Sequence, residues 1–140
     1  MSSSSLLRPA FRTLRTARTP SRLFTTTSPK MTVTEITSRA QFQEVLAKNP
    51  LVILDASAVW CGPCKAISPL YKKWSDEERY AGKIHFAKFD IDDVGDLTQE
   101  LGITSMPTFL FFKDGEKVDK VIGANPKVLE PKIEQHVAAL

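Results

Sequence analysis

Residues 51–69 read LVILDASAVWCGPCKAISP, and this stretch sets the arrangement of the rest of the chain. Its first part, Leu51 to Ser57, is almost continuously apolar, which is typical of a central strand buried on both faces. A tight turn then holds Cys61 and Cys64, the only two cysteines of the sequence, and a helix is expected to follow. Two cysteines separated by two residues directly after a strand are typical of a redox-active dithiol. The stretch therefore predicts a dithiol–disulfide oxidoreductase.

The turn supplies the thiolate that thiol–disulfide exchange requires. A free cysteine near pH 7 is mostly protonated. Cys61 stands where the strand ends and the helix begins, so the unpaired N–H groups and the positive end of the helix dipole favour its thiolate. We expect Cys61 to attack the substrate disulfide, and the more buried Cys64 to resolve the mixed disulfide. Pro63 stiffens the turn and has no N–H, which is expected to influence how readily the pair is oxidised.

Two other interpretations of the cysteine pair are weaker. A zinc site would need two more ligands, and the only histidines, His85 and His136, lie far apart in the expected fold. A purely structural disulfide would close a loop too small to constrain the unfolded chain much. We therefore expect a reversible Cys61–Cys64 disulfide, with no metal and no cofactor.

Asp55 is an acidic residue inside the apolar strand, six residues before Cys61. We expect it to lie buried beneath the turn, where burial raises its pKa. Its functional interpretation is a proton acceptor for Cys64 during resolution of the mixed disulfide. The alternative is a structural partner for Lys88 on the neighbouring strand, because buried acids are seldom left unpaired. The two roles are compatible, and we favour proton handling.

The remaining sequence predicts alternating strands and helices, followed by a hairpin and a closing helix. The expected elements are an edge strand over 32–36, a helix from Ser38 to Asn49-Pro50, a helix from the turn to about Tyr80 with Pro69 inside it, a strand over 83–90, a helix over 94–101, strands over 108–113 and 116–122 joined by Asp114-Gly115, and a helix from Pro126. This order predicts an α/β domain with a central mixed sheet of about five strands flanked by four helices.

Several short motifs occur together in the order found in one family. Asp55 is followed by the WCGPCK turn of residues 60–65, by Pro69, and by the sequences 105–108 (SMPT), 114–115 (DG) and 123–124 (GA). On these motifs residues 32–140 resemble thioredoxin. The resemblance implies the thioredoxin fold and a protein-disulfide reductase, which is itself reduced by an NADPH-dependent flavoprotein, thioredoxin reductase.

The resemblance also implies a substrate surface. It implies that the Met106–Pro107 bond is cis and faces the dithiol, and a cis proline is a deliberate feature of a tight turn. The apolar rim that receives target proteins would consist of Trp60, Gly62, Pro63, Met106, Gly123 and Ala124. Packing and turn geometry are the alternative explanation for these residues.

The chain departs from the family's usual pattern at two positions beside the turn. Ala56 stands where an aromatic residue is frequent, and Val59 where a polar or acidic one is. Val59 makes the rim more apolar, which is expected to alter which proteins dock.

Three functions are compatible with these features. The leading one is a disulfide reductase, and the second is an oxidase or isomerase of an oxidising compartment. Gly62-Pro63 in place of a Gly-His pair favours the reductant. The third is a binding module in which the dithiol is idle.

The first thirty residues differ in composition from the rest of the chain. They hold six of the 19 basic residues and none of the 16 acidic ones. A positively charged, Ser- and Thr-rich segment without acids is typical of a mitochondrial presequence. On a helix, Leu7, Phe11 and Leu14 would share one face. The sequence RLF at 22–24 resembles a matrix processing site, with cleavage after Phe24.

Other interpretations of this arm stay open. Ser- and Arg-rich ends readily remain unfolded, so a tail without a targeting role is one alternative. Nucleic-acid binding is weaker, because no structured basic face is expected. Initiation at Met31, where the domain begins, would give a cytoplasmic form.

These considerations together predict the organisation of the chain. We expect a cleaved presequence over 1–30, a domain over 31–140 and a location in the mitochondrial matrix. No run approaches the roughly 18 apolar residues of a membrane span, so we expect no membrane insertion. A monomer is the expected state, since no surplus apolar surface is evident.

Overall fold

The computed structural model describes residues 32–140, and a mixed sheet of five strands runs through the middle of this part. The predicted presequence and the alternative start at Met31 lie outside the described residues. The strands are β1 (Thr34–Glu35), β2 (Leu51–Ser57), β3 (His85–Asp90), β4 (Thr108–Lys113) and β5 (Glu116–Ile122). The helices are α1 (Arg39–Lys48), α2 (Gly62–Ser75), α3 (Gly95–Leu101) and α4 (Pro126–Ala138).

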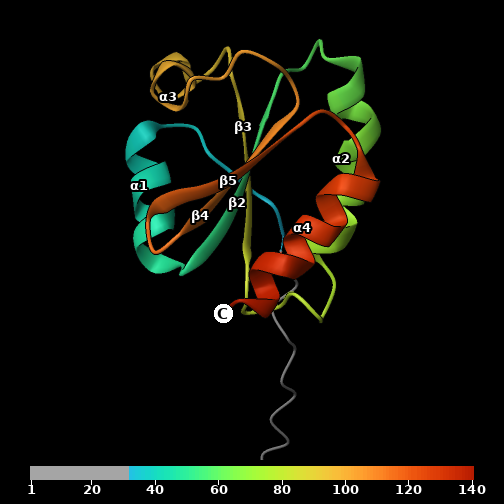
Figure 1. Cartoon of the computed structure of the whole chain (residues 1–140). Helices are drawn as coiled ribbons and strands as arrows, with labels where there is room; N and C mark the ends of the chain where they lie inside the picture. The colour runs from blue at the N-terminus through green and yellow to red at the C-terminus, as the bar shows by residue number, and fades with distance from the viewer. Residues whose placement is uncertain (1–31) are drawn as a thin grey trace, which may run out of the picture.

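The strand order β1-β3-β2-β4-β5 places β2 at the centre of the sheet. β2 runs parallel to β3 and antiparallel to β4, so it is hydrogen-bonded on both edges. α1 and α3 cover one face of the sheet, and α2 and α4 cover the other (Figure 1). This architecture confirms the predicted mixed sheet with four flanking helices.

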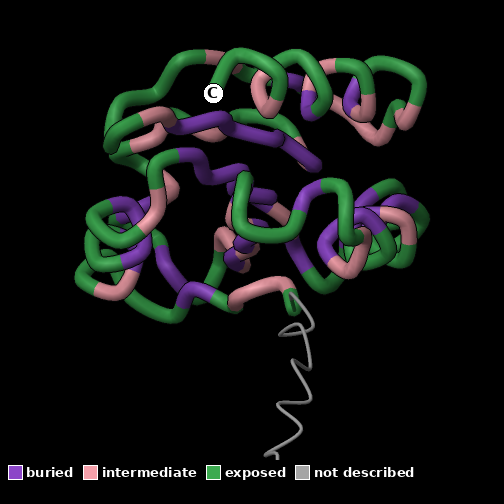
Figure 2. Tube along the Cα trace, turned by 90° about the horizontal axis from the view of Figure 1, so that it is seen from below, coloured by how far each residue is buried: buried purple, intermediate pink, exposed green. Residues whose placement is uncertain are grey.

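β2 is apolar along its length because each of its faces meets a different core. Val52, Leu54 and Ala56 pack with α1 and α3, whereas Leu51 and Ile53 pack with α2 and α4. Residues 51–56 are all buried, as the continuous apolar run predicted. Figure 2 shows the same layering, with buried residues along the middle strands and exposed ones on the outer sides.

The second helix is shorter than the sequence predicted, because it ends at Ser75 and not near Tyr80. The Ser75 hydroxyl donates a hydrogen bond back to the Lys72 carbonyl (2.6 Å). The Asp76 N–H donates to the carbonyls of Lys72 and Lys73, which tightens the last turn. Successive turns then return Tyr80 to the sheet, where its buried ring lies 6.1 Å from that of Phe86. That aromatic contact takes precedence over a longer helix.

Two strands begin or end at other residues than expected. The edge strand β1 consists of Thr34 and Glu35 alone, and β3 begins at His85 and not at residue 83. The strand ends depend on which residues find a hydrogen-bonding partner across the sheet, and the alternation of side chains does not reveal this.

A polar cluster fixes α4 onto β5. Asp119 Oδ2 accepts hydrogen bonds from Lys132 Nζ (2.7 Å) and lies 3.0 Å from His136 Nε2. The His136 ring stacks on Phe111, with centroids 4.7 Å apart. The Lys132 hydrogen bond, helped by that of His136, lowers the pKa of Asp119 to about 2.

We predict that Asp119→Asn destabilises the fold at neutral pH. The folded-state pKa lies below the unfolded value of about 3.9, so this contribution is complete above about pH 4 and is lost as the pH falls toward 2. The group is partly exposed, so we expect a loss of about 1 kcal/mol at pH 7. Denaturant unfolding at pH 7 and at pH 2 measures it. Glu116→Gln on the same strand is the control, and a D119N deficit that persists unchanged at pH 2 would contradict the assignment.

Candidate functional site

The two cysteines lie at the point where β2 passes into α2. Cys61 is the N-cap residue of α2, and its Sγ accepts a hydrogen bond from the Cys64 N–H (3.2 Å). Pro63 occupies the first turn of the helix, where its missing N–H costs no hydrogen bond. The pair forms a disulfide, with the Cα atoms 5.3 Å apart. In the reduced protein, this N–H and the helix dipole would favour negative charge on the Cys61 sulfur.

The two cysteines are buried to almost the same extent, contrary to the expectation that Cys64 is the more buried. Cys61 is 5% exposed and Cys64 is 4% exposed. In the disulfide both pack with Ala58, and Ile91 and Met106 cover them. The bridge spans a single helical turn, so it holds the Cys61 sulfur inward against Cys64. Position on the helix, and not exposure of the oxidised form, therefore distinguishes the two sulfurs.

Asp55 lies on β2 beneath this turn and is 3% exposed. Burial raises its pKa to about 7, and the nearby charge of Lys88 opposes that rise. Lys88 stands directly opposite Asp55 in the register of β2 and β3. Within the described part of the chain the two form no ion pair, and Asp55 Oδ1 has no hydrogen-bond partner. Asp55, Lys88 and Cys64 line one pocket of about 370 Å³, so the carboxyl group and the second cysteine share a hollow.

The segment before β4 approaches the cysteines from the other side. The Met106–Pro107 peptide bond is cis, and Met106 packs against the cysteine cluster. The Gly123 N–H donates to the Pro107 carbonyl (2.8 Å), which brings the end of β5 to the same place. Gly123 has a φ of +96°, a conformation that favours glycine.

Three of the predicted rim residues, Gly62, Pro63 and Ala124, do not pack against the cysteine cluster. Ala124 packs against the core beneath α2 and α4 and not against the cysteine cluster. Gly62 and Pro63 are exposed at the start of the helix. A Cβ at Gly62 would meet no atom within 4 Å, so neither close approach nor backbone geometry demands glycine there.

Trp60 is exposed and is held in place by the loop that follows β3. It is 63% exposed, and its indole N–H donates to Asp92 Oδ2 (2.8 Å). Asp90 Oδ2 accepts from the Val59 N–H (3.2 Å), and Asp90 Oδ1 accepts from the Asp92 N–H (2.8 Å). Val59 is 74% exposed, so an apolar pair projects from the turn.

Sequence reasoning missed the contribution of residues 90–92. Asp90 and Asp92 hold the turn, and Ile91 covers the cysteines. A signal was available, because β2 and β3 are parallel neighbours and their carboxyl ends must meet at one edge of the sheet. The residues directly after β3 therefore lie beside the dithiol.

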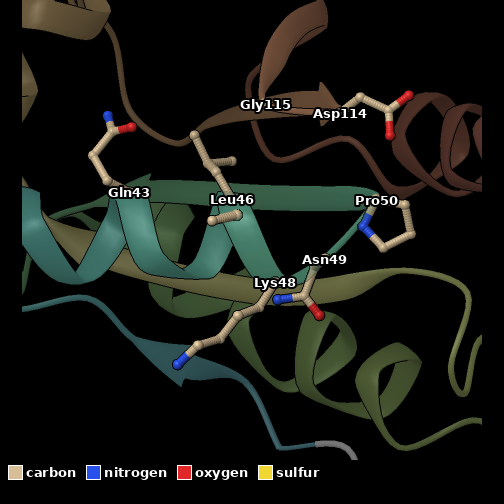
Figure 3. A pocket seen from close by; sticks show the side chains of 8 residues that line it. Gln43, Leu46, Lys48, Asn49, Pro50, Asp114 and Gly115 are labelled. Atoms are coloured by element: carbon tan, nitrogen blue, oxygen red, sulfur yellow. The ribbon is translucent and has the colours of Figure 1, made fainter.

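A larger hollow of about 500 Å³ lies at the opposite end of the sheet, between the end of α1 and the β4–β5 turn. Figure 3 shows the residues that line it, with Gln43, Leu46 and Lys48 on α1 and Asp114 and Gly115 at the turn after β4. It contains no cysteine or histidine, so it offers no redox chemistry. Across residues 32–140 no cluster of metal-binding side chains occurs, and no helix is long and apolar enough to cross a bilayer.

Comparison with known proteins agrees with this geometry. The profile of the Thioredoxin family matches residues 33–135. Thioredoxin-2 of Pyricularia oryzae is 47% identical over 115 residues, covering 82% of this chain and 66% of that protein. The crystal structure of a Malassezia sympodialis thioredoxin superposes with a TM-score of 0.73 at 44% identity, covering 78% of this chain and 94% of that one. Oxidised mitochondrial thioredoxin 3 of Saccharomyces cerevisiae gives 0.68 at 37% identity, covering 74% and 94%.

We predict that Asp55→Asn stabilises the oxidised protein above neutral pH. Because the folded protein binds this proton more tightly than the unfolded chain does, stability falls as the pH rises from about 4 to about 7 and then levels off. Asparagine removes the buried charge, so we expect a gain on the order of 2–4 kcal/mol at pH 8 and almost none at pH 4. Denaturant unfolding at both pH values measures the gain. The exposed Asp93→Asn is the control, and equal stability of D55N and wild type at pH 8 would refute the buried-charge assignment.

Proposed function

This chain belongs to the thioredoxin family and is a thiol–disulfide oxidoreductase, and we propose that Cys61 attacks target disulfides while Cys64 resolves them. The observation that carries this assignment is the position of Cys61 as the N-cap of α2, where its sulfur accepts the Cys64 N–H. The Cys61–Cys64 pair alternates between dithiol and disulfide. It thereby reduces protein disulfides and serves redox homeostasis.

The exchange proceeds in two balanced steps. The Cys61 thiolate attacks one sulfur of the target disulfide, forming a mixed disulfide and releasing one target thiolate. Cys64 then gives up its proton and attacks the Cys61 sulfur, forming the Cys61–Cys64 disulfide and releasing the second target thiolate. Two electrons pass to the target, and the dithiol is oxidised.

Asp55 is the proton acceptor for Cys64 in this proposal, and Lys88 sets the charge beside it. A carboxyl group with a pKa of about 7 both accepts and returns a proton at neutral pH. The pocket that Asp55 shares with Cys64 supports a transfer directly or through one water. Lys88, opposite in register, keeps part of the Asp55 population ionised and ready to accept.

Target proteins dock on the rim around the turn. The exposed Trp60, Gly62 and Pro63 lie on one side of the cysteines, and Met106, the cis Pro107 and Gly123 lie on the other, with Ala124 directly after Gly123 at the outer part of the rim. The exposure of Trp60 and Val59 supports apolar docking, because large exposed apolar groups that gather in one place mark interaction surfaces.

Thioredoxins are generally reduced by thioredoxin reductase. We assign the NADPH-dependent reductase as the electron donor of this chain, with protein disulfides as substrates and the monomer as the working form. An oxidase or isomerase would differ by a reduction potential well above that of the cytosolic glutathione pool. A binding module would keep its partner without any exchange at the cysteines.

We predict that Cys64→Ser traps target proteins as mixed disulfides on Cys61. The first step still occurs, but nothing attacks the Cys61 sulfur, so catalytic turnover in a disulfide-reduction assay is lost. Non-reducing gels of cells expressing this variant should show adducts that dithiothreitol releases. The double variant Cys61→Ser/Cys64→Ser is the matched control. Partner binding without dithiothreitol-sensitive adducts in C64S would establish the binding-module alternative and overturn the reductase mechanism.

The mitochondrial matrix is our proposed location, with residues 1–30 as a cleaved presequence ahead of a domain over 31–140. The arginine-rich, acid-free composition of residues 1–30 supports this, as does the likeness to a mitochondrial thioredoxin of yeast. A cytoplasmic form started at Met31 is the alternative.

We predict that deleting residues 1–30 preserves disulfide reduction in vitro and abolishes import into isolated mitochondria. The described fold begins at residue 32, so the deletion leaves every described residue in the chain. Protease protection in the import assay reads out the location. A variant with Arg8, Arg12 and Arg15 replaced by Gln is the matched control for charge. Protection of the truncated chain inside the matrix would disprove the presequence assignment.

A further inference from the structure

Three charged side chains form a row across the sheet at the level of Asp55. Glu35 of β1 is opposite Lys88 of β3, and Lys88 is opposite Asp55 of β2. Residues opposite one another in neighbouring parallel strands point to the same face of the sheet. The row therefore places one cation between two carboxylates on the face that α2 covers. Exposure falls along it, since Glu35 is exposed, Lys88 is half-buried and Asp55 is buried.

The three side chains share one hollow. Glu35, Lys88 and Asp55 all line the pocket that also contains Cys64. An adjoining hollow of about 190 Å³ is again lined by Glu35 and Lys88. Lys88 therefore borders open space along the row, and its flexible stem allows the ammonium to approach either carboxylate.

The backbone beneath the row is fixed, so the side chains alone have freedom. The buried Tyr71 hydroxyl lies 3.0 Å from the Ile53 carbonyl of β2 and 2.8 Å from the Ala87 carbonyl of β3. These carbonyls precede Asp55 and Lys88 in their strands. In residues 32–140 the Lys88 ammonium makes no hydrogen bond or ion pair, so it is bound to neither Asp55 nor Glu35.

From this arrangement we propose that Glu35 is a positioning residue that competes with Asp55 for the Lys88 ammonium and so raises the affinity of Asp55 for the proton of Cys64. The inference rests on the proposed role of Asp55 as the proton acceptor. When Asp55 is ionised, Lys88 turns toward it. When Asp55 takes the proton from Cys64, Lys88 turns toward Glu35, which keeps its charge compensated at the solvent edge.

The other titratable groups around Asp55 set the background for this competition. Cys64, Lys65 and Tyr71 face the site from α2, and Asp90 lies at the end of β3. Lys88 is the group whose charge opposes the effect of burial on the pKa of Asp55. Glu35 weakens the attraction between Lys88 and Asp55 and so raises the pKa of Asp55. Removing Glu35 therefore lowers that pKa.

The size of the effect follows from the spacing. Lys88 lies one strand separation, about 5 Å, from the strand of each carboxylate, so without Glu35 its ammonium can stay nearer to Asp55. With partial screening, we expect Glu35→Gln to lower the pKa of Asp55 by about half a unit at low ionic strength, and by less in 0.5 M salt. A shift of this size makes resolution at pH 6 about threefold faster, because more Asp55 is ionised and able to accept a proton.

The test measures the Asp55 titration directly. Carboxyl ¹³C shifts are followed against pH in the full-length oxidised protein, where the cysteines do not titrate, for wild type, Glu35→Gln and Glu35→Asp. Glu44→Gln is the matched control, because it removes another exposed carboxylate, on α1, which covers the opposite face of the sheet. We expect the half-unit fall in E35Q, a value near wild type in E35D and no shift in E44Q.

Lys88→Met tests whether Glu35 alters the pKa of Asp55 through Lys88. In the K88M background the E35Q shift should shrink to a small fraction of its size in the wild type. An unchanged Asp55 pKa in E35Q, an equal shift in E44Q, or a full E35Q shift in K88M would each overturn the proposal. Single-turnover resolution in D55N separates this inference from its premise. Loss of the pH midpoint near 7 in D55N supports the proton role of Asp55, and retention of that midpoint refutes it whatever E35Q does to the titration.

Discussion

The burial of β2 on both faces is the constraint on which the rest of the structure depends. The strand is hydrogen-bonded to β3 and β4, and its side chains fill two separate cores. It cannot shift along its axis without unpacking both. The Ile91 N–H also holds the Ser57 carbonyl at the end of the strand (2.9 Å). The turn that follows is thus delivered to a fixed place, and Cys61 becomes the N-cap of α2.

The same burial means that Asp55 lowers the free energy of unfolding, because one of its carboxyl oxygens has no hydrogen-bond partner. A carboxyl group in such a position avoids ionisation, and its pKa of about 7 reflects this. A group with a pKa near 7 can both take up and release a proton at neutral pH, and Asp55 lines the same pocket as Cys64. In the proposed mechanism the destabilising residue of the core is also the residue that handles the proton, so stability would be given up for function.

Local patterns in the sequence predicted those features that depend on neighbouring residues alone. The apolar run of β2, the dithiol turn and the DG hairpin each have a short-range cause, and the family motif anticipated the Met106–Pro107 geometry. The predicted end of α2 near Tyr80 was wrong, because Tyr80 packs against Phe86 of β3, and this long-range contact cannot be inferred from the helical pattern of residues 62–80. The near equality of cysteine burial was not foreseen, because both side chains pack in one cluster with Ala58. The support of Trp60 by Asp92 was missed because it depends on strand order.

Strand order also explains where the row of charged residues begins and ends. β1 is a two-residue edge strand, so the face beneath α2 opens to solvent beside Glu35, whereas the row continues inward from Asp55 to the buried Phe109. In the proposed mechanism Asp55 exchanges a proton, which needs a polar path to water, and the hollow lined by Glu35, Lys88 and Asp55 is the candidate for that path. Cys64 lines the inner part of that hollow, and the exposed Glu35 of the two-residue strand β1 lines it at the edge of the sheet.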